Sequence, residues 1–194
     1  MSIRPASEAD LPQILAIYGP YVENTTCSFE YTIPTMEEFT LRFRSITARF
    51  PWIVWEDAGV VLGYAYASAP FHRAAYSWVA EPSIYVAPQA QGRGIGRALY
   101  AALEESLRLQ GFYTLYSVVT ASNTDSVAFH LAVGYRLLAE FPDCGFKFGA
   151  WQGIIWLEKK LKSVETPTQM PLPWPEFVKT NRNFLNNLDS FTLS

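Results

Sequence analysis

The spacing of apolar and polar positions changes repeatedly along the chain, and each change marks an expected element. Apolar residues three and four apart predict four helices, two of which begin at the caps Ser7 and Thr35. A third helix ends at Gly111, and the fourth is capped by Asn123 or Thr124. Runs of β-branched and aromatic residues predict strands at residues 2–4, 52–56, 60–67, 76–86, 113–120, 135–141 and 154–161.

The order strand, helix, strand in the middle of the chain predicts a parallel strand pair joined by a crossover helix. The hairpins on either side, such as the one turned at residues 57–59, are expected to be antiparallel. Together they predict an α/β or α+β fold with a central mixed, twisted sheet and flanking helices. Pro82 has no N–H to donate, so it predicts a bulge or a break in the ladder of its strand.

The composition changes after residue 161. Residues 1–161 hold the periodic segments and are expected to form one domain, since 194 residues with 49% hydrophobic content suffice for one sizeable core. Residues 162–194 are rich in Pro and Asn, and the prolines predict an extension without regular elements that wraps over the surface. Four apolar side chains would allow it to dock on the domain: Met170, Leu172, Trp174 and Phe177.

Charge and cysteine content narrow the class of partner. A formal net charge of −3, without a run of Lys or Arg, argues against nucleic acid or an anionic membrane surface. No apolar run has the length of a membrane span. Cys27 and Cys144 form no disulfide framework and, with two histidines far apart, match no metal site, so no metal is expected. The start at Met1 lacks the pattern of a secretory signal, which makes the cytoplasm the expected location.

Residues 91–99, Gln-Gly-Arg-Gly-Ile-Gly-Arg-Ala-Leu, carry the most specific chemical signal. Three alternate glycines lie between an expected strand and an expected helix, where a ligand can approach the peptide N–H groups. The first amides of that helix are unpaired and the helix dipole is positive there, which predicts a phosphate or pyrophosphate site. The loop lacks the Gly-Lys-Ser/Thr ending of a P-loop, and the next strand lacks the carboxylate of a Rossmann fingerprint. A tight turn without a ligand is the plainer alternative.

Gln91, Gly94 and Gly96, placed after a strand, resemble the acyl-CoA pyrophosphate loop of the GNAT acetyltransferases. The segment at residues 123–135, with an Asn, a small residue three on, a His and a closing Gly-Tyr pair, fits the same superfamily. The resemblance implies that acetyl-CoA binds as cosubstrate where two parallel strands splay apart. The residues that it assigns to the cofactor are Tyr85, Val86, Gln91, Gly92, Arg93, Gly94, Ile95, Gly96, Arg97, Asn123 and Ser126.

Two titratable side chains are candidates for the chemistry that this arrangement performs. An amine must lose its proton before it attacks the acetyl group, and Glu81 on the first splayed strand is the candidate base. His130, where many GNAT chains have Tyr, is the candidate acid for the departing thiolate. The plainer interpretations are a solvated carboxylate at a strand end for Glu81 and a packed helix histidine for His130. Asn123 suits the pantetheine amides but also suits a helix cap.

Further segments resemble the phosphinothricin N-acetyltransferase family within GNAT, and they cover most of residues 3–160. They are residues 25–30, 34–38, 73–78, 81–86, 111–112 and 145–151. This family acetylates the α-amine of small amino acids that carry a phosphinate or sulfoximine, and it typically forms homodimers. The resemblance implies Glu81 as the general base and brings the segment of Phe29 toward the partner subunit's site. The side chains implied to surround the substrate are Phe29, Arg73, Tyr76 and Tyr85.

Four positions depart from that family. Phe148 stands where the family often has a His, and Phe71 stands where some members have a Lys near the substrate anion. Residues 152–153 read Gln-Gly in place of a His-Asp pair. These changes predict a more apolar pocket. The leading prediction is an N-acetyltransferase for a small amino-acid-like substrate; a GNAT for another small amine and a non-catalytic acyl-CoA-binding regulatory domain stay open.

Overall fold

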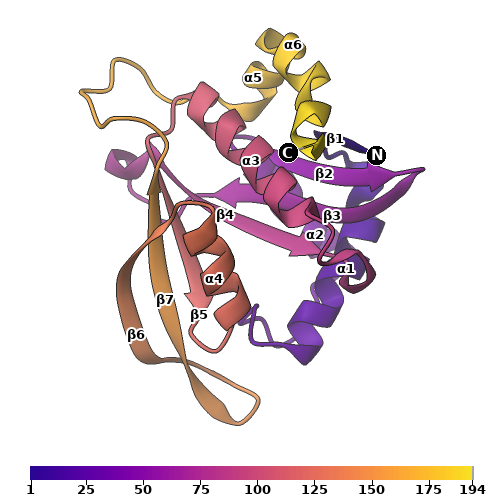
Figure 1. The fold of residues 1–194 in the computed structure, drawn as a ribbon, viewed down its shortest axis with the longest axis vertical. Coiled ribbons are helices and arrows are strands. Elements are labelled where there is room, and N and C mark those ends of the chain that lie inside the picture. Colours follow the sequence, from indigo (N-terminus) through magenta and orange to yellow (C-terminus); the bar gives the residue numbers. More distant parts are fainter. Residues whose placement is uncertain (194) are drawn as a thin grey trace.

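A sheet of seven strands runs through residues 1–193, which are the residues that the structure, a computed structural model, describes. The strands lie side by side in the order β1-β2-β3-β4-β5-β7-β6 (Figure 1). Their bounds are Ser2–Pro5 for β1, Trp52–Asp57 for β2, Val60–Ser68 for β3, Val79–Val86 for β4, Thr114–Thr120 for β5, Arg136–Lys147 for β6 and Ala150–Lys160 for β7.

The sheet is mixed, as the pattern of elements predicts. β4 and β5 pair in parallel, and the other neighbouring strands of the described sheet pair antiparallel. Helix α3, Ile95–Gln110, makes the crossover between the parallel strands. In Figure 1, α3 lies across β2, β3 and β4, while α4, Thr124–Ala132, lies beside β5. The predicted fold class is therefore confirmed.

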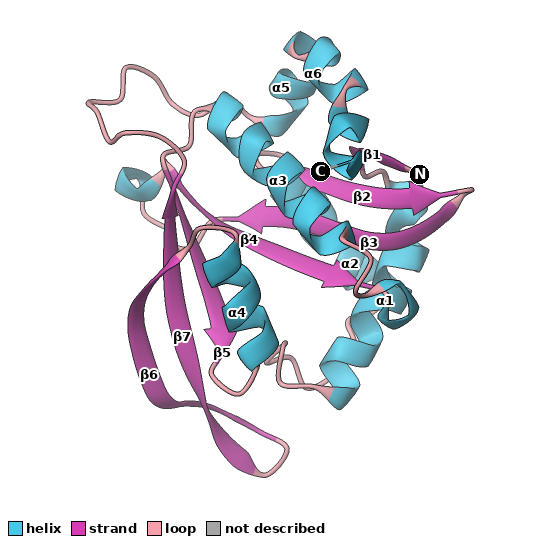
Figure 2. Cartoon of the chain, in the orientation of Figure 1, coloured by secondary structure: helices cyan, strands magenta, loops and turns pink. Residues whose placement is uncertain are grey.

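Helices cover both faces of the sheet. α1, Leu11–Asn24, and α2, Met36–Thr47, pack on each other behind the strands, on the side away from α3 (Figure 2). The Glu38 N–H donates to Thr35 Oγ1 at 3.2 Å and the Thr35 N–H donates to Glu38 Oε2 at 2.8 Å, which confirms the predicted capping box. The core on the two faces includes Trp52, Tyr64 and Leu99, each almost fully buried.

Three strand boundaries differ from the prediction. Tyr76 lies in the 3-10 turn Ala74–Tyr76, which the Ser77 hydroxyl closes by donating to the Ala74 carbonyl, so β4 begins only at Val79. β6 continues to Lys147 and β7 begins at Ala150, so both strands extend into residues 142–153, a Pro- and Gly-containing stretch in which the pattern predicts no strand. Cross-strand pairs such as Phe146 with Trp151 hold this β6–β7 arm together despite a register shift.

The C-terminal extension forms helices, so the prediction that its prolines break every regular element was wrong. The helices are α5, Trp174–Thr180, α6, Arg182–Asn186, and a 3-10 helix, Leu188–Leu193. Pro175 stands in the first turn of α5, where its missing N–H has no intrahelical partner to lose. The expected docking is confirmed for Trp174 and Phe177, which are buried, and Leu172 packs against the core, but Met170 is 57% exposed.

Candidate active site

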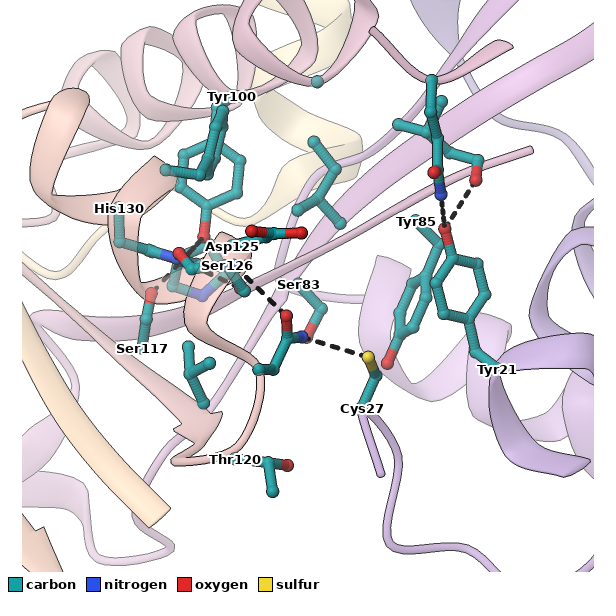
Figure 3. Close-up of a pocket in the computed structure, with 18 of the residues that line it drawn as sticks. Tyr21, Cys27, Ser83, Tyr85, Tyr100, Ser117, Thr120, Asp125, Ser126 and His130 are labelled. Atoms are coloured by element: carbon teal, nitrogen blue, oxygen red, sulfur yellow. Dashed lines mark hydrogen bonds between the residues drawn. The ribbon is translucent and has the colours of Figure 1, made fainter. Parts of the chain in front are cut away.

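A cavity of about 540 Å³ opens where β4 and β5 separate. Its walls come from β4, β5, α4 and the start of α3, with Tyr21 and Cys27 on the side toward α1 (Figure 3). This volume is within the usual range for small-molecule sites. The sequence-predicted site residues in its lining are Tyr85, Val86, Gln91, Gly92, Gly96, Asn123, Ser126 and His130. The structure therefore brings together two segments that lie on either side of β5 in the sequence.

The parallel pairing between β4 and β5 is short. Val79 pairs with Thr114 and Ala80 with Leu115, and the described ladder ends there. Pro82, two residues later, lacks an N–H for any ladder, and the β3–β4 register passes it without a bulge. Of the two predicted outcomes at Pro82, the structure shows the break and not the bulge. The peptide groups of β4 beyond it face a cavity in place of a neighbouring strand.

The glycine-rich segment makes the turn into α3. Gly92 and Gly94 have φ values of +71° and +80°, in the left-handed region that favours glycine, and Gly94 is the N-cap of α3. A Cβ placed on Gly96 would lie 3.7–3.9 Å from side-chain atoms of Ile84, Val86 and Phe129. The segment thus leaves the first amides of α3 uncovered beside the cavity, which is the geometry of an anion site.

Four predicted residues of this segment lie outside the cavity lining. Arg93, Gly94 and Arg97 are exposed to solvent. Ile95 is 2% exposed and its side chain belongs to the core beside Gly63. For Ile95, only the peptide N–H is placed to meet a ligand, and the cofactor role of all four residues stays a prediction.

His130 is buried in the cavity wall and holds a defined tautomer. Its Nδ1 lies 2.7 Å from the Ser126 carbonyl, which can only accept, so Nδ1 carries the proton. Burial lowers the pKa of His130, so the ring is neutral near pH 7 and Nε2 accepts the Tyr100 hydroxyl at 2.7 Å. Figure 3 shows the two side chains pointing toward each other, and the Ser117 hydroxyl lies 3.4 Å from the same Tyr100 oxygen. Burial raises the pKa of Tyr100 above its ordinary value.

Asn123 serves as a helix cap and also faces the cavity. Its Oδ1 accepts the Ser126 N–H at 3.2 Å, which confirms the predicted cap of α4. Its Nδ2 donates to Cys27 Sγ at 3.0 Å. Because both residues line the cavity, the amide of Asn123 is available to a ligand that displaces the thiol. The cofactor role of Asn123 and Ser126 stays a prediction.

Glu81 lies on β4, next to the lining residue Pro82 and opposite Ser68 of β3. Its carboxylate is half-buried, and burial raises its pKa. Among residues 1–193 it has no hydrogen-bond or ion-pair partner. Since side chains alternate along a strand, Glu81 shares a face with Tyr85, whose ring contacts Tyr18 of α1 at 5.0 Å. An unpaired, half-buried carboxylate beside a cavity suits a proton acceptor better than a solvated strand end does.

The residues implied to surround the substrate lie in three places. Phe29 is 39% exposed and its ring covers Gly145 on the β6–β7 arm, where a Cβ would come within 2.3 Å of it. Arg73 and Tyr76 lie in the β3–β4 connection, both exposed, and the Tyr76 ring is 4.6 Å from that of Phe71. Tyr85 lines the cavity itself. Their contact with substrate stays a prediction.

Tyr21 is a site residue that the sequence analysis missed, as is Tyr100. The Tyr21 hydroxyl donates to the Val86 carbonyl at 2.6 Å and accepts Gln91 Nε2 at 2.9 Å. It therefore joins the end of β4 to the start of the glycine-rich segment. Both tyrosines sit at helical spacing, which is typical of core residues, so the pattern gave no separate signal for them.

Lys147, on the β6–β7 arm, is a structural residue that the sequence analysis also missed. It is 2% exposed, and its Nζ donates to three backbone carbonyls, those of Val22, Thr25 and Ser28, at 2.7, 2.9 and 2.6 Å. Burial lowers its pKa, and no carboxylate among residues 1–193 pairs with it. The ammonium ties the arm to the segment after α1 that carries Cys27 to the cavity.

Residues 1–193 offer neither a metal site nor a membrane-spanning helix. No group of three or more His, Cys, Asp or Glu side chains is arranged there to hold a metal ion. No helix in this part of the chain has the length and apolar character that crossing a membrane requires.

Known proteins similar to this chain are acetyltransferases. A family model described as acetyltransferase (GNAT) domain matches residues 3–156. Phosphinothricin N-acetyltransferase of Streptomyces viridochromogenes is 35% identical over 154 residues, which cover 79% of this chain and 84% of that protein. The L-methionine sulfoximine/L-methionine sulfone acetyltransferase of Pseudomonas aeruginosa is 35% identical over 164 residues, covering 82% and 94%. A crystal structure of a GNAT superfamily phosphinothricin acetyltransferase from Sinorhizobium meliloti in complex with AcCoA has a TM-score of 0.84 and 36% identity, covering 91% and 97%.

The family model spans most of the chain, and the similarity extends through both segments that form the cavity wall. The resemblance predicted from the residues is therefore confirmed. The glycine turn into α3 and helix α4 with its Asn123 cap are the structural counterparts of the two sequence motifs. This chain belongs to the GNAT family of acetyltransferases.

Proposed function

We propose that this chain transfers an acetyl group from acetyl-CoA to the α-amine of a small amino-acid-like substrate. One observation carries the proposal: a single cavity between β4 and β5 contains both a helix N-terminus suited to an anion and side chains able to donate or accept a proton. The names of the relatives, phosphinothricin and methionine sulfoximine acetyltransferases, support the substrate class. In this proposal residues 1–161 form the catalytic domain and residues 162–194 an extension packed on it.

The cavity residues fit acetyl-CoA. Gly92 and Gly96 leave the first amides of α3 accessible, where backbone N–H groups and the helix dipole favour a pyrophosphate. The open peptide groups of Tyr85 and Val86 and the amide of Asn123 suit an arm that carries amide groups. The AcCoA-bound relative supports this assignment. Acetyl-CoA supplies an acetyl group on a sulfur that leaves readily.

Glu81 is the proposed general base. An ammonium has no lone pair, so its proton must leave before the nitrogen can attack the acetyl carbon. A carboxylate whose pKa is raised by burial holds a proton more strongly than an exposed one, which suits this step. Glu81 accepts the ammonium proton before the attack and passes it to solvent. After the C–N bond has formed, the C–S bond breaks, the nitrogen loses its second proton to solvent, and the sulfur gains a proton. A backbone N–H of the open part of β4 stabilises the oxyanion.

Tyr100 and His130 are proposed to serve the leaving sulfur. The thiolate needs a proton, and the Tyr100 hydroxyl lies in this part of the cavity lining, where it donates to His130 Nε2. In the proposed step the hydroxyl turns about its C–O bond from Nε2 to the sulfur, gives up its proton there and regains one from solvent. His130 is neutral and accepts from that hydroxyl, so we assign it to orienting Tyr100 as a positioning residue. The sequence-based proposal that His130 itself is the acid is thereby modified: its ring proton is held by the Ser126 carbonyl.

We also propose that the chain acts as a homodimer in the cytoplasm. Support for the dimer comes from the β6–β7 arm, at the edge of the sheet, which exposes large apolar side chains. They are Leu137, Leu138, Phe141, Phe146, Phe148 and Trp151. Support for the location comes from Cys27 and Cys144, which are exposed free thiols. Light scattering of the purified chain would test the dimer.

A thiol-release assay tests the proposed reaction. The chain is mixed with acetyl-CoA and, in turn, with single amino acids, polyamines and peptides, and free thiol is measured. We expect release with amino acids and a strong loss of release in Glu81→Gln. Acetyl-CoA binding without release for any amine would overturn the proposal in favour of a non-catalytic acyl-CoA-binding domain.

A further inference from the structure

Five aromatic side chains gather beside β5 and take no part in the steps above. The Phe71 ring lies at their centre, with its centroid 4.6 Å from Tyr76, 6.2 Å from Tyr116 and 5.9 Å from Trp156. The Trp156 ring also lies 6.1 Å from Tyr116 and 6.5 Å from Phe141. We call these five residues the aromatic cluster. Tyr76 is 44% exposed, so the cluster has a surface that a ligand can reach beside the β3–β4 connection.

The strand register places the aromatic cluster on the same face of the sheet as Glu81. Paired residues of neighbouring strands point to the same side, and Ala80 of β4 pairs with Leu115 of β5. The next residues, Glu81 and Tyr116, therefore share the opposite face, at the point where the strands begin to separate. Val118 pairs with Trp156 of β7, which puts the indole on that face as well. The proposed base and the cluster are thus neighbours across the opening.

The charges around the cluster are already paired or lie at its edge. Glu158, opposite Tyr116, is buried and bonded to both Arg136 and Lys160. Arg73, two residues after Phe71, is exposed, and its guanidinium has no hydrogen bond or ion pair within residues 1–193. Arg73 is therefore available for a carboxylate, while the rings themselves offer no positive charge for a second anion.

We infer that the aromatic cluster receives the side chain of the amino acid whose amine meets Glu81, and that it selects apolar, above all aromatic, side chains. Rings packed edge to face and stacked favour planar apolar groups. A phosphinate placed among them would lose its water without gaining a counter-charge, which is unfavourable. The inference rests on the proposed acetyl transfer and names the substrate class: L-phenylalanine, L-tryptophan and L-leucine before L-phosphinothricin or L-methionine sulfoximine.

The test compares specificity constants by thiol release. We measure kcat/KM of the wild-type chain for L-phenylalanine, L-leucine, L-phosphinothricin and L-alanine, whose methyl group is too short to cover the cluster. We expect the value for L-phenylalanine to exceed that for L-phosphinothricin at least 10-fold. Phe71→Lys places a cation among the rings, and there the ratio of the two values should fall at least 10-fold. Phe71→Leu is the matched control, and it should keep the wild-type order.

The outcomes separate this inference from the function on which it rests. No thiol release with any amino acid would refute the acetyl transfer itself. Two results would overturn the inference while keeping the reaction. One is a higher kcat/KM of the wild type for L-phosphinothricin than for L-phenylalanine. The other is that Phe71→Lys leaves the kcat/KM values of the amino acids, each divided by that for L-alanine, in the wild-type order. A Phe71→Lys variant that changes only the molar mass in solution would assign the cluster to contact with a second copy of the chain, and it would also overturn the inference. A wild-type preference that is lost in Phe71→Lys and kept in Phe71→Leu would support it.

Discussion

Substitution of Gly96 by Ala separates the stability of the fold from its ability to bind acetyl-CoA. Gly96 is the second residue of α3, has a helical backbone and lines the cavity. An added Cβ would meet its three nearest atoms, on Ile84, Val86 and Phe129, at 3.7–3.9 Å, which are ordinary contact distances. The folded chain therefore accepts the methyl group without a shift, and the only space that it removes belongs to the cavity.

The two expected effects have opposite signs. Ala is favoured over Gly in a helix by roughly 1 kcal/mol in the interior, so at this second position we expect a gain of about 0.5 kcal/mol in the free energy of unfolding. The same methyl keeps a phosphate oxygen from approaching the backbone N–H groups. Loss of one charge-assisted hydrogen bond, about 1.5–3 kcal/mol, corresponds to a roughly 10- to 150-fold rise in Kd for acetyl-CoA.

The assay is calorimetric titration with acetyl-CoA alongside urea unfolding of the same samples. Gly59→Ala is the matched control, because it adds the same methyl group without a clash but outside the cavity. Gly59 lies in the β2–β3 turn with φ +83°, and its Cβ would have no atom within 4 Å. That variant should lose about 1–2 kcal/mol of stability and bind acetyl-CoA like the wild type. Wild-type affinity in Gly96→Ala would refute the placement of the pyrophosphate at the start of α3.

Three further changes test the other parts of the site. Glu81→Gln should lower kcat/KM by about 10²–10⁴-fold. Because burial raises the pKa of this carboxyl, wild-type activity should fall as the pH drops through the raised pKa. If the variant shows the same fall in activity at acidic pH, Glu81 is not the base. Lys147→Met deprives three carbonyls of their donor, and urea unfolding should show a loss of about 2–4 kcal/mol; a stability within 0.5 kcal/mol of wild type would mean that water replaces the ammonium. Phe177→Ala removes a fully buried ring of the extension and should cost about 3–5 kcal/mol by the same measurement, whereas an extension that only rests on the surface would lose little.

The features that the sequence predicts well depend on residues close together in the chain. The capping box of Thr35 with Glu38 is completed within one helical turn, so its pattern determines its geometry. Gly92 and Gly94 lie in a left-handed turn that glycine adopts more readily than any other residue, which makes the strand-to-helix junction visible in the sequence. The missing N–H of Pro82 is also a local property, and β4 and β5 do not pair beyond it.

The features that the sequence does not reveal are contacts made through space. Tyr100 and His130 are thirty positions apart and meet only because α3 and α4 pack on the same side of the sheet. The β6–β7 arm is another case, since Pro and Gly are typical of loops, and only pairing across the hairpin makes strands of these residues. The aromatic cluster likewise depends on the register of three strands, which hydrophobic periodicity does not give.

Phe148 shows how a departure from the family pattern acquires a physical meaning from such contacts. Phe148 and Gly149 form the tip of the β6–β7 arm with φ values of +53° and +74°. Positive φ at both positions is typical of a tight hairpin turn, and for Phe it carries strain of about 1–2 kcal/mol. Its ring lies outside the cavity lining, 4.9 Å from Lys147 Nζ, where a cation–π contact of about 0.5–1 kcal/mol offsets part of that strain. Phe148 therefore supports the ammonium that ties the arm to the segment beside the cavity, and the prediction of an apolar substrate pocket depends on Phe71 instead.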